Sequence, residues 1–315
     1  MCTAVIYDNR YFGRNLDYDH SFGEEVILTG QKFPFAFPEG KPMGEHFAIL
    51  GTALVQEGYP LYFDAMNEKG LAMAGLLFEG NAVYHAPVSG KDNIPSWAFI
   101  PWVLGQCETV AESEKLLLRL NLTDVPFSKH LPPSPLHWMI ADRTRSLVVE
   151  SMADGLHVHE NPVGVLTNNP PFPFHLKNLN QYLNLTVEEP RNRFSGHIDL
   201  KPFSRGMGAF GLPGDWSSPS RFVRAAFVRT NALSDGGVSQ FFHILSSVEQ
   251  PKGCVRLRKG GLEHTLYSVC YDLSEGICWR RGYDSMEWER YASIAAETEG
   301  NGLQWLQKTL IFKGL

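Results

Sequence analysis

The segments of this chain that predict β-strands come in runs, and those that predict helices stand in separate blocks. "TAVIY" and "YFGRNLD" flank the turn-forming pair Asp8 and Asn9 and predict a hairpin at the beginning of the chain. "YPLYFDAM" and "LAMAGLLF" flank "NEKG", where Gly70 supplies the turn, and predict a second hairpin. Further strands are predicted at 136–142, 146–151, 155–160, 265–273 and 276–283, and helices at 109–120, 220–233 and 238–248. This order lacks a regular βαβ rhythm and favours an α+β fold of packed layers over a doubly wound parallel sheet.

Length and charge narrow the classes of partner. A chain of 315 residues, 43% of them hydrophobic, can bury a large core. The formal net charge is -6 and no basic run is present, so we expect small-molecule partners and no nucleic acid. No apolar stretch reaches the roughly 18 residues of a membrane span, and the basic-then-apolar layout of a signal peptide is absent. We therefore expect a cytoplasmic protein without membrane contact.

The five cysteines do not form a disulfide or zinc pattern. Cys107, Cys254, Cys270 and Cys278 lack CxxC spacing and are interpreted as ordinary buried thiols, whereas Cys2 has no packing explanation. His157 and His159 in "HVHE" share one strand face, a spacing that metals can use, but no third ligand is evident and a structural or surface role is favoured. His137 and Trp138 in "LHWMIAD" are interpreted as core packing. No metal and no cofactor are predicted.

The first hairpin brings three chemically distinctive residues together. If the chain reverses near Asp8, residue 2 lies opposite residues 14–17, because antiparallel partners share a nearly constant index sum. Cys2 is then a neighbour of Arg14 and Asp17. Two positions three apart cannot share a face of a regular strand, so a bend or a strand end is expected between Arg14 and Asp17.

Such a trio suits nucleophilic catalysis. A guanidinium beside a thiol favours the reactive thiolate. If Met1 is removed, Cys2 also carries an α-amino group, which titrates near neutral pH and can act as the base. Asp17 could then hydrogen-bond the amine and orient it. The alternative is that Cys2 is incidental and that Arg14 and Asp17 form a weak surface pair.

Several motifs resemble one known family. "MCT", "FGRNLD", "MNEKGLAMAGLLF", "LHWMIAD", "GVLTNNP", "NLNQY", "GLPGD" and "SRFVRAAF" occur in order along nearly the whole chain. Together they are similar to the choloylglycine hydrolase family, N-terminal-nucleophile (Ntn) hydrolases that include bile salt hydrolases and penicillin V acylases. The resemblance implies a four-layer αββα sandwich, a single domain over residues 2–315, removal of Met1, and amide hydrolysis through a cysteine acyl-enzyme.

The resemblance also implies a set of site residues. Cys2 matches the nucleophile, Arg14 the arginine beside the sulfur, and Asp17 the aspartate that contacts the α-amino group. Asn168, the first asparagine of "TNNP", matches the side-chain amide of the oxyanion hole. Arg221 in "SRFVRAAF" matches a second active-site arginine.

Two nearby positions need separate comment. Leu77 in "AGLLF" stands where bile salt hydrolases usually carry asparagine and penicillin V acylases tyrosine. The family uses the backbone N–H here as the second oxyanion donor, so leucine keeps the donor but loses a side-chain hydrogen bond. Arg224, one helical turn after Arg221, is interpreted as a surface charge.

Conjugated bile acids are the implied substrates. Leu16 and Leu77 are expected to wall an apolar acyl pocket. The proline-rich segment 127–136 is a candidate lid over it, and an inert surface connection is the alternative. Hydrolysis of penicillin V or of another N-acyl amide is the alternative. Retention of Met1 would leave a catalytically inactive bile-acid-binding protein. The segment from about 183 to 210 could reach a neighbouring subunit, as in the homotetramers of this family.

Overall fold

The computed structural model describes residues 1–38, 42–258, 260–285, 287–296 and 300–311. Its first element is the predicted hairpin, formed by β1 (Cys2–Tyr7) and β2 (Tyr11–Tyr18). Asp8 and Asn9 have φ values of 54° and 49°, the left-handed conformation of the two central residues of a type I′ turn, and the Arg10 N–H donates to the Tyr7 carbonyl oxygen at 3.1 Å. The register pairs Cys2 with Leu16, as the index-sum argument predicted.

The hairpin belongs to an eight-stranded sheet, which we call the first sheet. Its order is β12-β1-β2-β14-β15-β16-β18, with β13 paired to β14, and the paired strands are antiparallel. The strands that complete it are β12 (Val165–Leu166), β13 (Val255–Arg256), β14 (Leu262–Asp272), β15 (Ile277–Gly282), β16 (Trp288–Arg290) and β18 (Thr309–Ile311).

A second eight-stranded sheet packs on the first. Its order is β11-β10-β9-β6-β5-β4-β3-β17. The predicted second hairpin is β5 and β6, with Gly70 at φ 85° in the turn. The bounds are β3 (Glu25–Thr29), β4 (Ile49–Gln56), β5 (Tyr59–Asn67), β6 (Ala72–Leu77), β9 (Leu136–Ala141), β10 (Ser146–Met152), β11 (Gly155–Glu160) and β17 (Leu303–Trp305).

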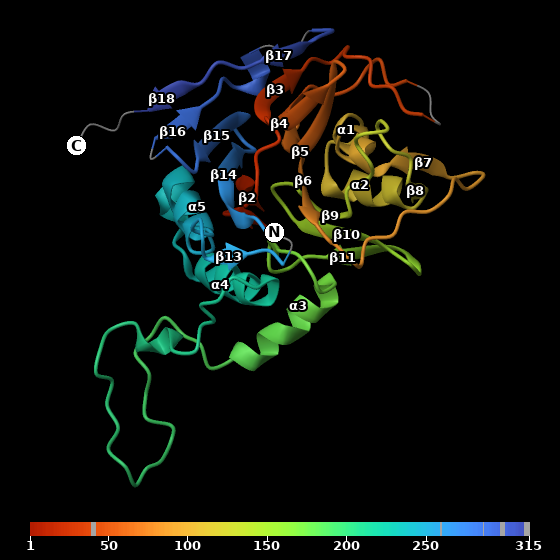
Figure 1. Cartoon of the computed structure of the whole chain (residues 1–315). Coiled ribbons are helices and arrows are strands. Elements are labelled where there is room, and N and C mark those ends of the chain that lie inside the picture. The colour runs from red at the N-terminus through yellow and green to blue at the C-terminus, as the bar shows by residue number, and fades with distance from the viewer. Residues whose placement is uncertain (39–41, 259, 286, 297–299, 312–315) are drawn as a thin grey trace.

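Helices cover the outer faces of both sheets and complete four layers (Figure 1). On the first sheet lie α4 (Ser218–Asn231) and α5 (Gly237–Ser246), whose apolar side chains share one core with residues of both sheets. On the second sheet lie α1 (Phe99–Leu104) and α2 (Val110–Leu117), which enclose another core. The predicted αββα sandwich is confirmed.

The segment between α3 (Phe172–Asn178) and α4 leaves the body of the molecule (Figure 1). We call residues 183–210 the arm. Its large apolar side chains are exposed, among them Phe194 at 82% and Phe203 at 86%. Short 3₁₀ helices lie at Ser96–Ala98, Leu179–Tyr182, Met207–Ala209, Ser234–Gly236 and Ile294–Ala296. No helix among the described residues is both long and apolar enough to cross a membrane.

Two expectations need correction. The helix predicted over 109–120 begins after its Thr109 cap, whose side chain accepts from the N–H of Glu112, but it ends at Leu117. Leu120 instead opens β8 (Leu120–Thr123), because pairing with β7 (Asp92–Pro95) buries this segment as a strand. Cys254 is exposed and not a buried thiol.

Candidate active site

Cys2 lies at the beginning of a strand that has neighbours on both sides. β1 pairs with β2 on one side and with β12 on the other. Asn168 follows two residues after β12 and therefore comes beside Cys2 from a distant part of the sequence. The Cys2 side chain is nearly buried, and its backbone N–H donates to the side-chain oxygen of Asn168 at 2.8 Å.

Arg14 is fully buried between the two sheets. Its Nη1 donates to the carbonyl oxygen of Gly75 at 2.6 Å, and its Nε lies 4.0 Å from the carboxylate of Asp64. Asp64 in turn accepts hydrogen bonds from the hydroxyls of Tyr267 and Tyr271, both at 2.6 Å. The Nη2 of Arg14 is buried without a partner among the described residues. Arg14 is thus held from one side by Asp64 and keeps a free donor.

The groups around Arg14 favour its charged form. Burial pushes the pKa of Arg14 down, but electrostatic interactions with Cys2, Tyr267 and Asp64 outweigh burial and raise the pKa above its ordinary value. Burial raises the pKa of the Asp64 carboxyl, and Arg14 opposes that shift. Cys2 and Asp64 therefore share one guanidinium.

Asp17 is buried beside the end of the chain, and its carboxylate oxygens accept from residues other than Cys2. Thr265 donates to Asp17 Oδ1 at 2.6 Å, and Gln250 donates to Oδ2 at 2.9 Å. The backbone of Asp17 pairs with Met1, which is still attached. The Cys2 nitrogen belongs to a peptide group and has a single hydrogen, which it donates to the side-chain oxygen of Asn168. A direct bond from Asp17 to an amine therefore requires the loss of Met1.

The bend expected between Arg14 and Asp17 has a counterpart on the neighbouring strand. The pairing of β14 with β2 shifts between Thr265 and Tyr267, so that Leu266 forms a bulge. The shift lets Thr265 reach Asp17 while Tyr267 reaches the Asp64 that supports Arg14. The irregularity thus lies in the partner strand and not in β2.

Arg221 joins the nucleophile strand to Asn168. From α4, its Nη1 donates to the Cys2 carbonyl oxygen and to Thr3 Oγ1, both at 2.6 Å. Its Nη2 donates to Asn168 Oδ1 at 2.7 Å. The carboxylate oxygen Oδ2 of Asp17 lies 3.9 Å from Nη1. Burial lowers the pKa of Arg221, and interactions with Asp17 and Cys2 partly offset this shift. Arg221 therefore connects α4 to both Cys2 and Asn168.

Leu77 ends β6 opposite Asn168. The Nδ2 of Asn168 donates to the Leu77 carbonyl oxygen at 2.7 Å, which leaves a second hydrogen on that nitrogen. In a strand, the N–H and C=O of one residue point to the same side. The Leu77 N–H therefore points to the side on which Asn168 lies. Together these groups can supply two donors to one developing negative charge.

A cavity of about 230 Å³ opens beside Cys2. Leu16 and Leu77 line it, as predicted, together with Arg14. The segment 127–136 supplies Phe127, Leu131, Pro132, Ser134, Pro135 and Leu136, so the predicted lid segment forms one wall. Further apolar walls come from Phe22, Leu54, Leu61, Phe63, Trp97, Ile100 and Trp138. The cavity can hold a rigid apolar group next to the sulfur.

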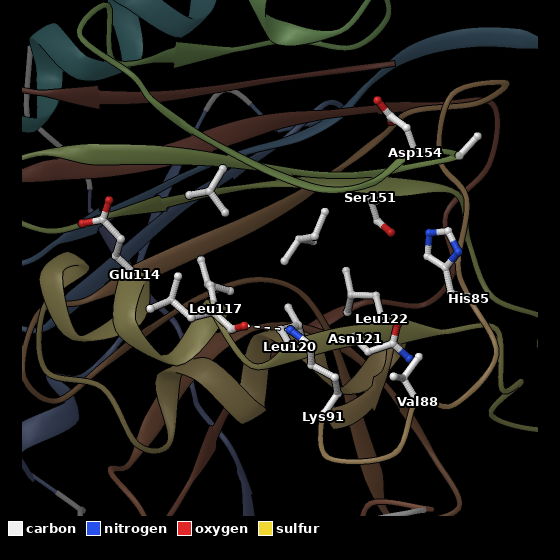
Figure 2. Close-up of a pocket in the computed structure, with 15 residues that line it drawn as sticks. His85, Val88, Lys91, Glu114, Leu117, Leu120, Asn121, Leu122, Ser151 and Asp154 are labelled. Carbon is white, nitrogen blue, oxygen red and sulfur yellow. Dashed lines mark hydrogen bonds between the residues drawn. The ribbon is translucent and has the colours of Figure 1, made fainter.

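A larger hollow of about 680 Å³ lies elsewhere, between α2, β8 and β11. Figure 2 shows leucines such as Leu117 and Leu122 along it, with Lys91 bonded to the carbonyl oxygen of Leu118 at 2.9 Å. None of the predicted site residues is among the described residues that line it. The chemistry is therefore assigned to the smaller cavity.

Other singled-out residues lie outside the cavity or have unexpected roles. Arg224 is buried, not a surface charge, because its guanidinium donates to the carbonyl oxygens of Ser247 and Pro213 at 2.7 and 2.6 Å. His157 pairs with Asp154 at the surface. Across the described ranges, no group of three or more His, Cys, Asp or Glu side chains is gathered as a metal site requires.

Sequence reasoning missed the residues that support the predicted ones. Asp64, Gln250 and Thr265 contact Arg14 or Asp17, yet none lies in a motif that signals this. A carboxylate in the otherwise apolar "YFDAM" of β5 was the one available hint at Asp64, because buried charges require a partner.

Comparisons with known proteins agree with this geometry. Residues 2–298 match the family described as linear amide C-N hydrolases, choloylglycine hydrolase family. The bile salt hydrolase/transferase of Lactiplantibacillus plantarum is 50% identical over 293 residues, which cover 91% of this chain and 90% of that protein. The mutant C2A conjugated bile acid hydrolase from Clostridium perfringens has a TM-score of 0.90 at 34% identity, over 98% and 97% of the two chains. Penicillin V acylase from Agrobacterium tumefaciens, at 18% identity and a TM-score of 0.68 over 100% of both chains, shares the fold.

Proposed function

The chain belongs to the choloylglycine hydrolase family of linear amide C–N hydrolases, and we propose that it hydrolyses glycine- or taurine-conjugated bile acids with Cys2 as the nucleophile. The observation that carries this proposal is that Cys2 lines an apolar cavity together with Arg14, while its backbone N–H donates to Asn168. A steroid acyl group suits such walls, while the amide carbonyl reaches the polar groups at the cavity mouth.

In the acylation step, the Cys2 thiolate attacks the carbonyl carbon of the substrate amide. Arg14 favours the thiolate through its charge and its free Nη2. The carbonyl oxygen becomes an oxyanion, which accepts from Asn168 Nδ2–H and from the Leu77 N–H. When the intermediate collapses, the C–N bond breaks and the glycine or taurine nitrogen takes a proton from the Cys2 ammonium.

In the deacylation step, the free α-amine of Cys2 takes a proton from water. The resulting hydroxide attacks the thioester carbon, the same two donors hold the oxyanion, and the C–S bond breaks. The bile acid leaves and the thiolate is restored. Arg221 and Asp17 are proposed to orient the amine, since Arg221 already binds the Cys2 carbonyl oxygen.

We propose that removal of Met1 creates the amine. The Met1 ammonium lies 2.8 Å from Glu263 and donates to the Asp17 carbonyl oxygen at 2.8 Å. While Met1 remains, the Cys2 nitrogen is a peptide nitrogen and cannot act as a base. A fusion with residues before Cys2 should be inactive, and a protease that leaves Cys2 as the first residue should restore activity in the same sample. Activity of the uncut fusion would contradict this role for the amine.

The substrate is tested with wild type beside Cys2→Ser. Release of glycine from glycocholate and of taurine from taurocholate is measured by amino-group detection, with phenoxyacetate release from penicillin V as the comparison. We expect bile acid turnover in wild type, near-complete loss in Cys2→Ser, and unchanged melting of the variant. Faster hydrolysis of penicillin V would favour the alternative that the enzyme is a penicillin V acylase. Leu77 leaves this alternative open, because it carries neither the asparagine of bile salt hydrolases nor the tyrosine of penicillin V acylases.

We also propose that the enzyme is a homotetramer in the cytoplasm. The arm exposes large apolar side chains that a lone chain rarely leaves in water, and burial against another copy would cover them. Light scattering should give four times the chain mass, and Phe194→Ser with Phe203→Ser should lower it. A monomeric wild type would contradict the proposal. The free thiols, Cys2 included, suit a reducing compartment, which cell fractionation would test.

A further inference from the structure

Two buried histidines outside the proposed chemistry lie against the backbone that carries Asn168. The Nε2 of His137, on β9, is 2.9 Å from the carbonyl oxygen of Thr167. The Nε2 of His175, on α3, is 2.8 Å from the carbonyl oxygen of Asn168 itself. Because a carbonyl oxygen only accepts, each Nε2 must carry the hydrogen. The peptide groups on both sides of the Asn168 α-carbon are thus held by imidazoles.

Glu150 fixes His137 from the opposite side of the ring. Its Oε1 lies 3.0 Å from His137 Nδ1, and both residues are fully buried. The same carboxyl group accepts from the N–H of Phe172 at 3.0 Å and 3.2 Å. One hydrogen must lie between Nδ1 and Oε1, whichever atom carries it. The His137 ring therefore cannot turn without losing bonds at both of its nitrogens.

His137 also contacts the strand that carries the other oxyanion donor. Phe78 directly follows Leu77, and its ring stacks on that of His137 with centroids 4.3 Å apart and an angle of 3°. One face of the imidazole therefore touches the residue after Leu77, while its edge holds the residue before Asn168. The two donors come from segments that are distant in sequence, β6 and the residues after β12, and His137 is in contact with both.

We propose that His137 is a positioning residue, which holds the Thr167–Asn168 peptide against β6 so that the Leu77 and Asn168 donors keep their spacing. Glu150 and His175 complete this support. The inference rests on the proposed function, because it assumes that an oxyanion forms between those donors. Preorganised donors lose much of their effect when they are displaced by even about 1 Å. Loss of the His137 bonds should therefore slow steps that form an oxyanion.

The variants separate positioning from packing. His137→Phe keeps a ring to stack on Phe78 but removes both polar atoms, whereas His137→Gln keeps an N–H donor near the original Nε2. His46→Phe is the matched control, because His46 is also buried and its nitrogens lie 2.7 and 2.8 Å from two backbone carbonyl oxygens. His46 is not among the described cavity-lining residues. All proteins carry Cys254→Ser, because Cys254 is exposed and would react with thiol reagents.

Two reactions of Cys2 provide the readout. With p-nitrophenyl acetate the thiolate attacks the ester carbon, an oxyanion forms, and nitrophenolate leaves. With iodoacetamide the thiolate displaces iodide and no oxyanion forms. Nitrophenolate release is corrected with Cys2→Ala protein, and alkylation is followed by intact mass. Both reagents work without a bile acid.

We expect His137→Phe to slow acylation about 10- to 100-fold while alkylation changes less than about twofold. His137→Gln should recover most of the acylation rate, and His46→Phe should alter neither reaction. Equal slowing of both reactions by His137→Phe, or no slowing of acylation, would overturn the inference, as would wild type that is not acylated. If His137→Phe does not fold, Glu150→Gln decides, because it should slow acylation but not alkylation. Wild type that is acylated but hydrolyses no conjugated bile acid would refute the proposed function alone.

Discussion

The side-chain oxygen of Asn168 accepts two hydrogen bonds, from the Cys2 N–H at 2.8 Å and from Arg221 Nη2 at 2.7 Å. Two donors on one atom define the amide orientation, so that Nδ2 must face Leu77, whose carbonyl oxygen is 2.7 Å away. The hydrogen bond from Arg221 thereby fixes Asn168 with Oδ1 toward Cys2 and Nδ2 toward Leu77. The other hydrogen bonds of Arg221 go to the carbonyl oxygens of Cys2 and Trp216 and to the hydroxyl of Thr3.

This orientation predicts how substitutions of Asn168 behave. Asn168→Ala removes one donor and should lower kcat about 10²- to 10³-fold with little change in KM. Asn168→Asp has the same shape but puts a carboxylate oxygen where Nδ2 donates, next to the developing negative charge. Its kcat should fall at least as far. Steady-state kinetics with glycocholate measure both, and an aspartate variant more active than the alanine variant would contradict the assigned orientation.

Leu77 permits a test of a backbone donor. The N–H of Leu77 points away from β9, because its carbonyl oxygen faces Asn168 and the next residue, Phe78, donates to Pro135. Leu77→Pro therefore removes the site donor without removing a bond to β9, and kcat should fall about 10²-fold or more. Leu77→Asn keeps the N–H and should change kcat only a few-fold. Circular dichroism melts of the two proteins provide the folding control.

Asp64 should restrain the effect of Arg14 on the sulfur. Asp64→Asn removes one of the two anions that share the guanidinium, so the positive charge then acts more strongly on Cys2. We expect a higher rate of Cys2 alkylation by iodoacetamide at pH 6 and a loss of about 2–4 kcal/mol of unfolding free energy. The control variant Tyr271→Phe removes one hydrogen bond to Asp64 but leaves the charge of Asp64 in place. It should leave the alkylation rate unchanged. A slower reaction of Asp64→Asn would show that Asp64 assists the thiolate.

His175 should make the protein less stable in acid. Burial lowers its pKa to about 4 from an ordinary 6.5; His137 adds to this shift, while the Asn168 carbonyl and Glu150 oppose it. Between these values the unfolded chain binds more protons than the folded one, so unfolding free energy falls as pH falls. Lowering pH from 7 to 5 should cost wild type about 2 kcal/mol more than His175→Gln. Urea titrations at the two pH values measure this difference, and equal losses in both proteins would contradict it.

Local signals were sufficient for the first hairpin and the position of Arg14. Three residues, Asp8 to Arg10, separate the paired Tyr7 and Tyr11, and a reversal there puts Cys2 opposite Leu16, within the range 14–17 that counting predicted. Asn168 and Arg221 lie 166 and 219 residues from Cys2, and no local pattern joins them. Only their resemblance to family motifs suggested that they meet.

Helix periodicity was misleading at Arg224. A charged residue one turn after Arg221 is typical of a solvent-facing helix position. The segment before α4 instead folds back over Arg224, and its carbonyl oxygens accept hydrogen bonds from the guanidinium. His137 shows the same difficulty. It is buried in a core strand as expected, yet its polar atoms are bonded on both sides, and no sequence pattern indicates which distant carbonyl it meets.

The sulfur of Cys2 is carried by a strand that is bonded to β2 and β12 inside the first sheet, not by a surface loop. Such a strand cannot move aside while the sheet persists, because its ladder bonds on two edges would have to break together. The reactivity of Cys2 consequently depends on the first sheet, which unfolds as one cooperative unit with the rest of the molecule. Denaturants should abolish turnover at the concentration at which the whole molecule melts, with no inactive but folded species in between.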